Sequence, residues 1–231
     1  MKILIPPSEG KSLLNTSSLK FKDTNNKFIK DIILVLNKLR NLTDSDLVKT
    51  YGTSNDKSIK IHDQNLNLMN SKCSASIERY TGVVYNNLNP IGLDEESRKF
   101  FNNNFLITSA MLGLVSPNEM IPFYKLKMNV LKLVDFWRPI FSNFLEKEDL
   151  IIDLLPEIHR KSYESKNILK INFYFEKNGK IISSGHNGKV IKGKYLRFIV
   201  NNQIENPDDL TRFDEDGFVW DGKRFIKRIH K

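Results

Sequence analysis

The sequence predicts a mixed α/β fold in a single domain, with a mixed central sheet wrapped by helices. Short apolar runs at Lys2–Ile5, Phe105–Thr108 and Leu150–Leu154 have the length of buried strands. Between them, Phe28–Leu39 repeats apolar residues at the i, i+3, i+4 and i+7 spacing of an amphipathic helix. No linker, internal repeat or low-complexity segment divides the 231 residues, so one domain spanning residues 1–231 is expected.

The composition favours a polyanionic partner. The chain is 40% hydrophobic and 27% charged, which is ordinary for a globular protein, and it carries a formal net charge of +9. The basic residues are spread along the chain and not gathered in a tail, so folding must create any basic surface. DNA, RNA and phosphorylated small molecules are the partners that such a charge attracts.

The single cysteine and the N-terminus indicate a cytoplasmic protein. Cys73 alone excludes an internal disulfide and a cysteine zinc site, which fits a reducing compartment. The apolar run Lys2–Ile5 is too short for a signal peptide, and no segment could span a bilayer. We therefore expect no membrane partner.

Residues 43–66 predict two helices joined by a turn. Thr43 is a typical N-cap and is followed by acidic residues, which favour a first helical turn. This helix should end at Tyr51-Gly52, and Ser54 can cap a second helix that runs to Leu66. Further along, Asp94–Asn102 predicts another helix with a capping acid.

The C-terminal third predicts two hairpins around a helix. In Ile168–Phe175 the odd-numbered residues are all apolar and the even-numbered ones include Lys170 and Asn172, so two faces alternate as along a strand. Asn178-Gly179 then turns the chain into Lys180–Ser184. Residues 188–200 follow as a helix, on which Lys194 and Arg197 lie three apart on one face. The last hairpin covers residues 218–226 around an Asp-Gly turn.

The central stretch combines a strand, a small-residue loop and two lysines. Small residues and Ser116-Pro117 follow the Phe105–Thr108 strand, as in a tight turn over a sheet end. In Phe123–Met128 two lysines then alternate with apolar residues. On a strand, Lys125 and Lys127 would share the face opposite Tyr124. A helix over residues 130–145 comes next. The stretch suggests an anion site, although two solvated lysines on an amphipathic strand would explain this segment alone.

The loop Ser8–Lys11 follows the first strand. It is not a Walker A loop, because Ile5 stands where the first glycine is needed and Pro6-Pro7 lack the backbone donors that would hold phosphate. A polar loop with a lysine at the end of a strand is nevertheless where open α/β sheets commonly bind ligands.

Motifs for metal, cofactor or hydrolytic chemistry are absent from the sequence. His62, His159, His186 and His230 are scattered without metal-ligand spacing, so packing or surface roles are expected for them. No Ser-His-Asp elbow or paired-carboxylate motif stands out. The sequence therefore predicts no cofactor and no metal, and it leans away from an enzyme.

Several motifs together resemble the YaaA family of peroxide stress proteins. They are residues 6–11 (Pro-Pro-Ser-Glu-Gly-Lys), residues 77–85, residues 109–113 (Ser-Ala-Met-Leu-Gly), residues 122–128 (Pro-Phe-Tyr-Lys-Leu-Lys-Met) with Asp135-Phe136-Trp137, and residues 188–200. The resemblance extends from about residue 3 to residue 228. Departures include Met111-Leu112, Ser116, Lys127 and Val83, the last of which replaces an aspartate common in the family.

The resemblance implies a cytosolic response to hydrogen peroxide that limits oxidative damage by free iron. It implies DNA binding with little sequence preference, and a helix-hairpin-helix element at residues 43–66. The basic cleft that we expect neutralises phosphates. Tyr51, Tyr124 and Tyr195 could stack on exposed bases, although packing in the core is the default for at least two of them. The expected anion-binding residues are Ser8, Lys11, Gly52, Lys125, Lys127, Lys189, Lys192, Lys194 and Arg197.

Two other classes of function remain open from the sequence. An enzyme acting on a nucleotide or another phosphorylated small molecule would use the Ser8–Lys11 loop, Ser109 and Lys125 as a pocket. A scaffold would instead expose a large apolar patch. A pocket of ligand size would favour the enzyme, and an open groove near duplex width would favour DNA.

Overall fold

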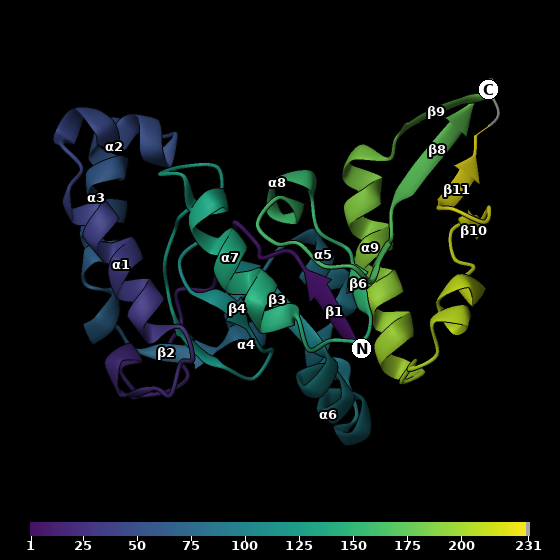
Figure 1. Cartoon of the computed structure of the whole chain (residues 1–231), viewed down its shortest axis with the longest axis horizontal. Helices are drawn as coiled ribbons and strands as arrows, with labels where there is room; N and C mark the ends of the chain where they lie inside the picture. The colour runs from purple at the N-terminus through teal and green to yellow at the C-terminus, as the bar shows by residue number, and fades with distance from the viewer. Residues whose placement is uncertain (230–231) are drawn as a thin grey trace.

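A computed structural model describes residues 1–229, so His230 lies outside the described residues (Figure 1). Within this range the main sheet has five strands in the order β4-β3-β1-β6-β7. β1 pairs in parallel with β3 and with β6, β6 pairs in parallel with β7, and β3 pairs antiparallel with β4. The strands are β1 (Lys2–Ile5), β3 (Phe105–Ser109), β4 (Gly113–Val115), β6 (Ile151–Asp153) and β7 (Ile168–Lys170).

The centre of this sheet is buried on both faces. Ile3, Leu4 and Ile5 of β1 are fully buried, and all five residues of β3 are buried. Parallel strands covered on both faces are expected to be continuous apolar runs, which is why these segments show no alternation. The parallel pairing also brings the carboxyl ends of β1, β3 and β6 to one edge.

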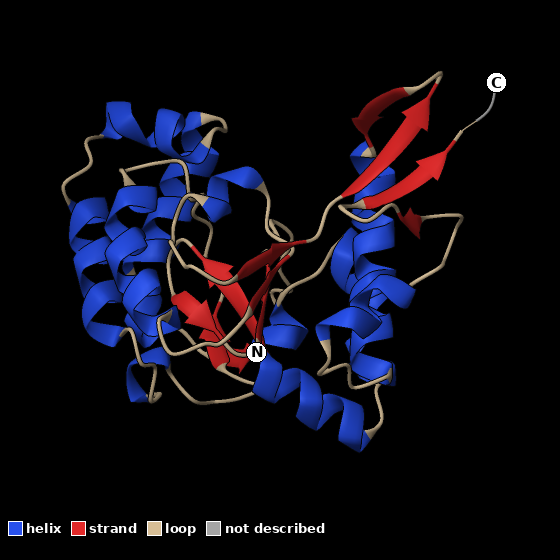
Figure 2. Cartoon of the chain, turned by 45° about the vertical axis from the view of Figure 1, so that its right-hand side comes forward, coloured by secondary structure: helices blue, strands red, loops and turns tan. Residues whose placement is uncertain are grey.

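Helices flank the sheet on both sides (Figures 1 and 2). In Figure 1, α1, α2 and α3 lie at the left, α7 crosses the centre, and α9 stands at the right. The helices are α1 (Ile29–Arg40), α2 (Asp44–Tyr51), α3 (Asn55–Leu66), α4 (Ser76–Arg79), α5 (Val83–Leu88), α6 (Glu95–Asn104), α7 (Leu133–Leu145), α8 (Glu157–Arg160) and α9 (Gly185–Asn201). Four 3-10 segments, η1 (Phe21–Asp23), η2 (Leu68–Asn70), η3 (Pro90–Gly92) and η4 (Pro207–Arg212), complete the helical part of residues 1–229.

The caps predicted around α2 are confirmed. The Asp46 carboxylate accepts hydrogen bonds from the Thr43 amide (3.0 Å) and hydroxyl (2.7 Å) at the start of the helix. Gly52 ends it in a left-handed conformation with φ of 65°, which glycine adopts without strain. Two helices and a turn therefore occupy residues 43–66 as the sequence predicted, and their assignment to a helix-hairpin-helix module stays a prediction.

Two smaller sheets complete the strands. β2 (Cys73–Ala75) pairs with β5 (Met120–Pro122), and a four-stranded sheet has the order β10-β11-β8-β9. Its strands are β8 (Phe173–Lys177), β9 (Lys180–Ser183), β10 (Val219–Trp220) and β11 (Phe225–Arg228). Both predicted hairpins, around Asn178-Gly179 and Asp221-Gly222, are confirmed.

Aromatic packing joins the four-stranded sheet to α9. Tyr195 of α9 lies 5.4 Å from Phe173 and 5.2 Å from Phe225, measured between ring centroids, and these two phenylalanines stack at 5.1 Å. Aromatic pairs at such separations add to the free energy of burial. Because Tyr195 is fully buried in this cluster, the predicted stacking of its ring on an exposed base is wrong.

The structure corrects two predicted strands. Ile168–Phe175 is divided between β7 of the main sheet and β8 of the smaller sheet, because the chain leaves one sheet and enters the other at residues 171–172. Phe123–Met128 is not a strand, since β5 ends at Pro122. There the side chain of Asn65 takes the place of a strand partner: its Oδ1 accepts from the Lys125 amide (3.0 Å) and its Nδ2 donates to the Lys125 carbonyl (2.7 Å).

The fold class predicted from the sequence is confirmed, with mixed helix and strand content in one compact domain around a mixed sheet. None of the helices within residues 1–229 combines the length and the apolarity needed to cross a bilayer.

Candidate functional site

A cavity of about 1370 Å³ opens where β1 and β6 end. The loop after β1 (residues 6–11) forms one part of it, and the loop after β6 (residues 155–160) forms another. The α2–α3 turn and residues 124–129 line one side, while α5 and the start of α9 line the other. Ligands of open α/β sheets bind outside the carboxyl ends of the strands, so this cavity occupies the expected place.

The structure brings most of the predicted site residues together and leaves two outside. Lys194 does not line the cavity, and its Nζ donates to both carboxylate oxygens of Asp216 (2.8 and 2.9 Å). Arg197 also lies elsewhere and donates to the carbonyl oxygens of Leu88 (3.1 Å) and Gly92 (2.7 Å). The residues that do line the cavity are Ser8, Lys11, Gly52, Lys125, Lys127, Lys189 and Lys192.

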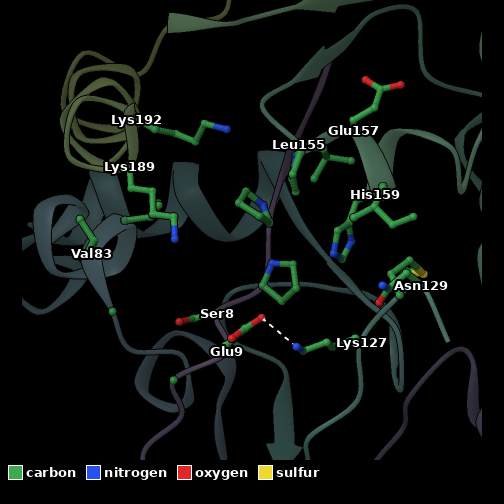
Figure 3. Close-up of a pocket in the computed structure, with 18 of the residues that line it drawn as sticks. Ser8, Glu9, Val83, Lys127, Asn129, Leu155, Glu157, His159, Lys189 and Lys192 are labelled. Carbon is green, nitrogen blue, oxygen red and sulfur yellow. Dashed lines mark ion pairs between the residues drawn. The ribbon is translucent and has the colours of Figure 1, made fainter. Parts of the chain in front are cut away.

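Cationic side chains outnumber acidic ones in the lining. Lys57, Arg160 and the five lining lysines above contribute cations, and Glu9 and Glu157 contribute the acids. Figure 3 shows Lys189 and Lys192 entering from α9 on one side, with Lys127 and His159 on the other. Charges of one sign around a concave, low-dielectric surface concentrate the field and attract anions.

Lys11 lines the cavity and packs against two tyrosines. Its Nζ is 4.4 Å from the ring centroid of Tyr124 and 5.3 Å from that of Tyr80, and it donates to the Ser8 carbonyl oxygen (2.7 Å). Burial lowers the pKa of Lys11 to about 7, and the nearby positive charge of Lys125 contributes to this lowering. A large fraction of this amine is therefore neutral near pH 7.

A chain of buried hydroxyls runs beneath Lys11. Ser109 Oγ accepts from the amides of Met111 (3.2 Å) and Leu112 (2.9 Å), so its own proton is free to go to Tyr124 Oη, 2.7 Å away. Tyr124 Oη in turn lies 2.7 Å from Tyr80 Oη, and either hydroxyl can donate in this hydrogen bond. Burial raises the pKa of Tyr124 to about 12, so this hydroxyl keeps its proton at neutral pH. We call Lys11, Tyr80, Ser109 and Tyr124 the floor.

Close backbone packing fixes the loop that carries Lys11. The Thr81 amide donates to the Gly10 carbonyl (3.0 Å), and the Ser12 amide donates to the Arg79 carbonyl (2.8 Å). Gly82 has a φ of 107°, and a Cβ there would lie 2.9 Å from Ser8 Oγ. A glycine is thus required at position 82 both for its conformation and for the contact with the loop.

A buried ion pair forms the wall after β6. Asp153 is fully buried, and its carboxylate accepts from Arg160 Nε (3.2 Å), from the Tyr163 hydroxyl (2.7 Å) and from the Leu155 amide (2.7 Å). These bonds satisfy the carboxylate and hold Arg160 at the cavity. Lys192 Nζ donates to the Leu154 carbonyl, and burial, followed by the charge of Arg160, lowers the pKa of Lys192 to about 8.

His159 also lines the cavity. Its Nδ1 lies 2.9 Å from Thr108 Oγ1, and burial lowers the pKa of His159 to about 4. The imidazole is therefore neutral at physiological pH. Tyr51, whose hydroxyl contacts His62 Nδ1 (3.0 Å), and Tyr124 both line the cavity but are buried, so neither presents an open ring face for stacking.

Four lysines surround the cavity nearer to solvent, and we call them the rim lysines: Lys57, Lys125, Lys127 and Lys189. Three are exposed and Lys125 is half-buried. Lys127 Nζ lies 3.9 Å from Glu9 Oε1, an exposed pair that Figure 3 marks with a dashed line. Gly52, one of the expected anion-binding residues, lines the cavity, but its amide donates to the Val48 carbonyl of α2.

Sequence reasoning missed several lining residues, namely Lys57, Asn129, Glu157, His159 and Arg160. A signal existed for those after β6. They follow a buried strand, and the loops after parallel strands share one edge of the sheet. Lys57 carries no such signal, because only the tertiary position of α3 brings it to the cavity.

Thiol and metal chemistry would depend on Cys73 and on possible metal ligands among residues 1–229. Cys73 is fully buried, and burial raises the pKa of its thiol to about 11, so the reactive thiolate is scarce at neutral pH. Within residues 1–229, histidine, cysteine and acidic side chains form no group of three or more that could hold a metal ion.

Comparison with known proteins identifies relatives along nearly the whole chain. A family model described as "Peroxide stress protein YaaA" matches residues 1–224. An uncharacterised protein of Campylobacter jejuni is 31% identical over 226 residues, which is 91% of this chain and 89% of the relative. A UPF0246 protein of Fusobacterium nucleatum is 29% identical over 254 residues, covering 98% of each chain. A UPF0246 protein of Agathobacter rectalis is 24% identical over 238 residues, covering 95% of this chain and 93% of the relative.

Proposed function

Because this chain belongs to the family of the peroxide stress protein YaaA, we propose that it binds DNA in the cytoplasm, largely without sequence preference. Family membership supports a role in the peroxide stress response, and DNA binding is the molecular activity that we assign within it. By covering DNA, the protein would limit iron-dependent oxidative damage without binding iron itself. The proposed interface is the cavity at the ends of β1 and β6.

The observation that carries this proposal is the convergence of the rim lysines. Lys57 comes from α3, Lys125 and Lys127 from the loop after β5, and Lys189 from α9, yet all four line one cavity. Phosphate contacts by such side chains give affinity and orientation without reading bases, because every nucleotide carries the same phosphate. That is why little sequence preference is expected.

The size of the cavity supports a polymer ligand. At about 1370 Å³ it exceeds the range of about 300–1,000 Å³ that is usual for small-ligand sites. The α2–α3 turn lies on one side, so the proposed helix-hairpin-helix element would meet the same DNA segment as the rim lysines.

A salt series of DNA binding tests the proposal. Fluorescence anisotropy with a labelled duplex and a labelled single strand would compare the wild type with a Lys125→Ala/Lys127→Ala/Lys189→Ala variant. Removing one phosphate-binding lysine should make the log–log salt slope shallower by roughly 1. A matched control is Lys22→Ala/Lys99→Ala/Lys223→Ala, which removes the same charge from exposed positions outside the cavity.

We expect the cavity variant to lose affinity and salt dependence for both DNA forms, and the control to keep them. Equal losses in the two variants would mean that only net charge matters. In that case, or if the wild type does not bind at low salt, the proposed interface is wrong.

The floor favours a second candidate, an enzyme that acts on a nucleotide or another phosphorylated small molecule. A concave site with a half-buried lysine of lowered pKa next to a hydroxyl chain is typical of catalytic centres. Saturable binding of a free nucleotide, with no binding of DNA at low salt, would favour this candidate.

A further inference from the structure

Lys11 differs from the rim lysines in its ring contacts. Its amine packs over the rings of Tyr80 and Tyr124 and is anchored to the Ser8 carbonyl oxygen. Lys57, Lys127 and Lys189 are exposed, and Lys125, although half-buried like Lys11, has no such ring contact within residues 1–229. An exposed lysine serves as a point charge. Lys11 instead packs against two tyrosine rings in a cavity lined by other cations. A ligand held by those cations would lie within reach of its amine, which could then react with it.

We propose that Lys11 is a nucleophile whose Nζ forms a Schiff base with the aldehyde carbon of a phosphorylated deoxyribose. This inference rests on the proposed function, because the rim lysines would bind the phosphates that flank the sugar. The same sugar phosphate occurs in two sources, an abasic site within DNA and free 2-deoxyribose 5-phosphate.

The chemistry of the site fits an aldehyde. A lysine amine attacks a carbonyl only when it is neutral, and burial lowers the pKa of Lys11 to about 7. An abasic sugar has lost its base, so it can enter the cavity without the unstacking that a paired base would require. Its phosphates, three atoms or more from the aldehyde, would remain near the rim.

The step balances without an oxidant or reductant. The lone pair of neutral Lys11 Nζ forms a bond to the aldehyde carbon, and the C=O π pair moves to oxygen, which takes a proton from the amine through solvent. The carbinolamine hydroxyl then leaves as water after taking a second proton from solvent. The product is a protonated imine, in which one N–H proton remains.

Lys192 is the natural comparator. It is the other lysine of the cavity whose pKa burial lowers, to about 8, but its Nζ donates to the Leu154 carbonyl beside Arg160 and not above the tyrosines. Peptide mapping of a trapped adduct distinguishes the two lysines directly, because a reduced imine adds a stable mass to one side chain.

The test is reductive trapping with sodium cyanoborohydride. One arm uses a duplex with a single abasic site, a second uses free 2-deoxyribose 5-phosphate, and a control duplex carries a tetrahydrofuran analogue that has no aldehyde. Wild type, Lys11→Arg and Lys99→Arg are compared, since arginine keeps the positive charge but cannot form the imine. Circular dichroism verifies folding, and anisotropy with an intact duplex measures DNA binding in the same samples.

We expect an adduct with the abasic duplex that maps to Lys11 in the wild type, persists in Lys99→Arg, and falls to the tetrahydrofuran background in Lys11→Arg. Mapping in the wild type supports the inference even if Lys11→Arg does not fold. An adduct at Lys11 from the free sugar phosphate alone, with no binding of intact duplex, would keep the nucleophile and overturn the proposed function. Intact-duplex binding without any adduct, or an adduct at Lys192 or another lysine, would overturn the inference and leave the proposed function standing.

Discussion

The floor and the rim of the cavity contain the same residue type in opposite environments. Lys11 lies against two tyrosine rings with a lowered pKa, while Lys57, Lys127 and Lys189 are exposed. At the rim, a long side chain in water supplies charge and little else. At the floor, removal from water makes the charge costly and the neutral amine available. Burial therefore decides what each lysine can do.

The largest expected effect comes from breaking the buried ion pair between Asp153 and Arg160, after β6. Asp153→Ala would leave Arg160 without its buried partner and should lower the free energy of unfolding by about 3–5 kcal/mol. The matched control within the same cavity is Glu9→Ala. It removes an exposed pair with Lys127 and should change stability by less than about 1 kcal/mol.

Urea denaturation of both variants measures this contrast. Similar losses from the two changes would contradict the distinction between buried and exposed charges in the cavity.

The hydroxyl chain gives the next largest effect. Tyr124→Phe would leave the Ser109 and Tyr80 hydroxyls without their shared partner, and buried unpaired hydroxyls cost about 1–3 kcal/mol each. Thermal unfolding should detect a clear loss of stability. Tyr174→Phe, at a half-buried tyrosine of the same cavity, is the control and should have little effect.

Lys11→Met should change stability in the opposite direction. Folding lowers the pKa of Lys11 from 10.5 to about 7. The unfolded state therefore binds more protons between these values, and wild-type stability rises with pH across that window. The penalty of burying the charge is complete at and below pH 7, where Lys11→Met should be more stable by roughly 1–2 kcal/mol.

That advantage should shrink as the pH approaches 10. Lys125, Glu9 and Arg79 are the charged neighbours that also influence Lys11, and all three remain in the variant. Urea denaturation at pH 7 and pH 10 checks the sign. A variant that is less stable than the wild type at pH 7 would mean that the interactions of the Lys11 amine outweigh the cost of its burial.

Changes at the rim should have the smallest effect on folding. Lys127→Ala removes an exposed side chain and should alter stability by less than about 0.5 kcal/mol. The same change should weaken DNA binding and reduce the salt slope by about 1. A large loss of stability with unchanged DNA binding would reverse the roles assigned to floor and rim.

Local sequence signals predicted most of the elements. The Asn178-Gly179 turn and the Thr43 cap each depend on a few neighbouring residues, so their positions could be read from the chain. The division of Ile168–Phe175 between two sheets could not, because alternation gives the face of a strand and not the sheet to which it belongs. Likewise, the clamp by Asn65 on Lys125 joins residues 60 apart in sequence.

The site was predictable in part. Helical spacing of about 100° per residue puts Lys194 and Arg197 about 200° and 140° away from Lys192, so one helix could not turn all three toward the same cavity. The burial of Lys11 depends on Tyr80 and Tyr124, which lie far from it along the chain, and no motif announces such an arrangement. Sequence thus located a basic region but could not separate the floor from the rim.

The most direct test of the contrast between floor and rim is the titration of Lys11 itself. Heteronuclear NMR would follow the Cε and Nζ resonances of lysines between pH 5 and pH 11, with the Lys11 signal assigned by its absence from Lys11→Met. A midpoint near pH 7 is the predicted result. A midpoint near the ordinary lysine value of about 10.4 would show that the floor amine is charged like any exposed lysine, and would contradict the account.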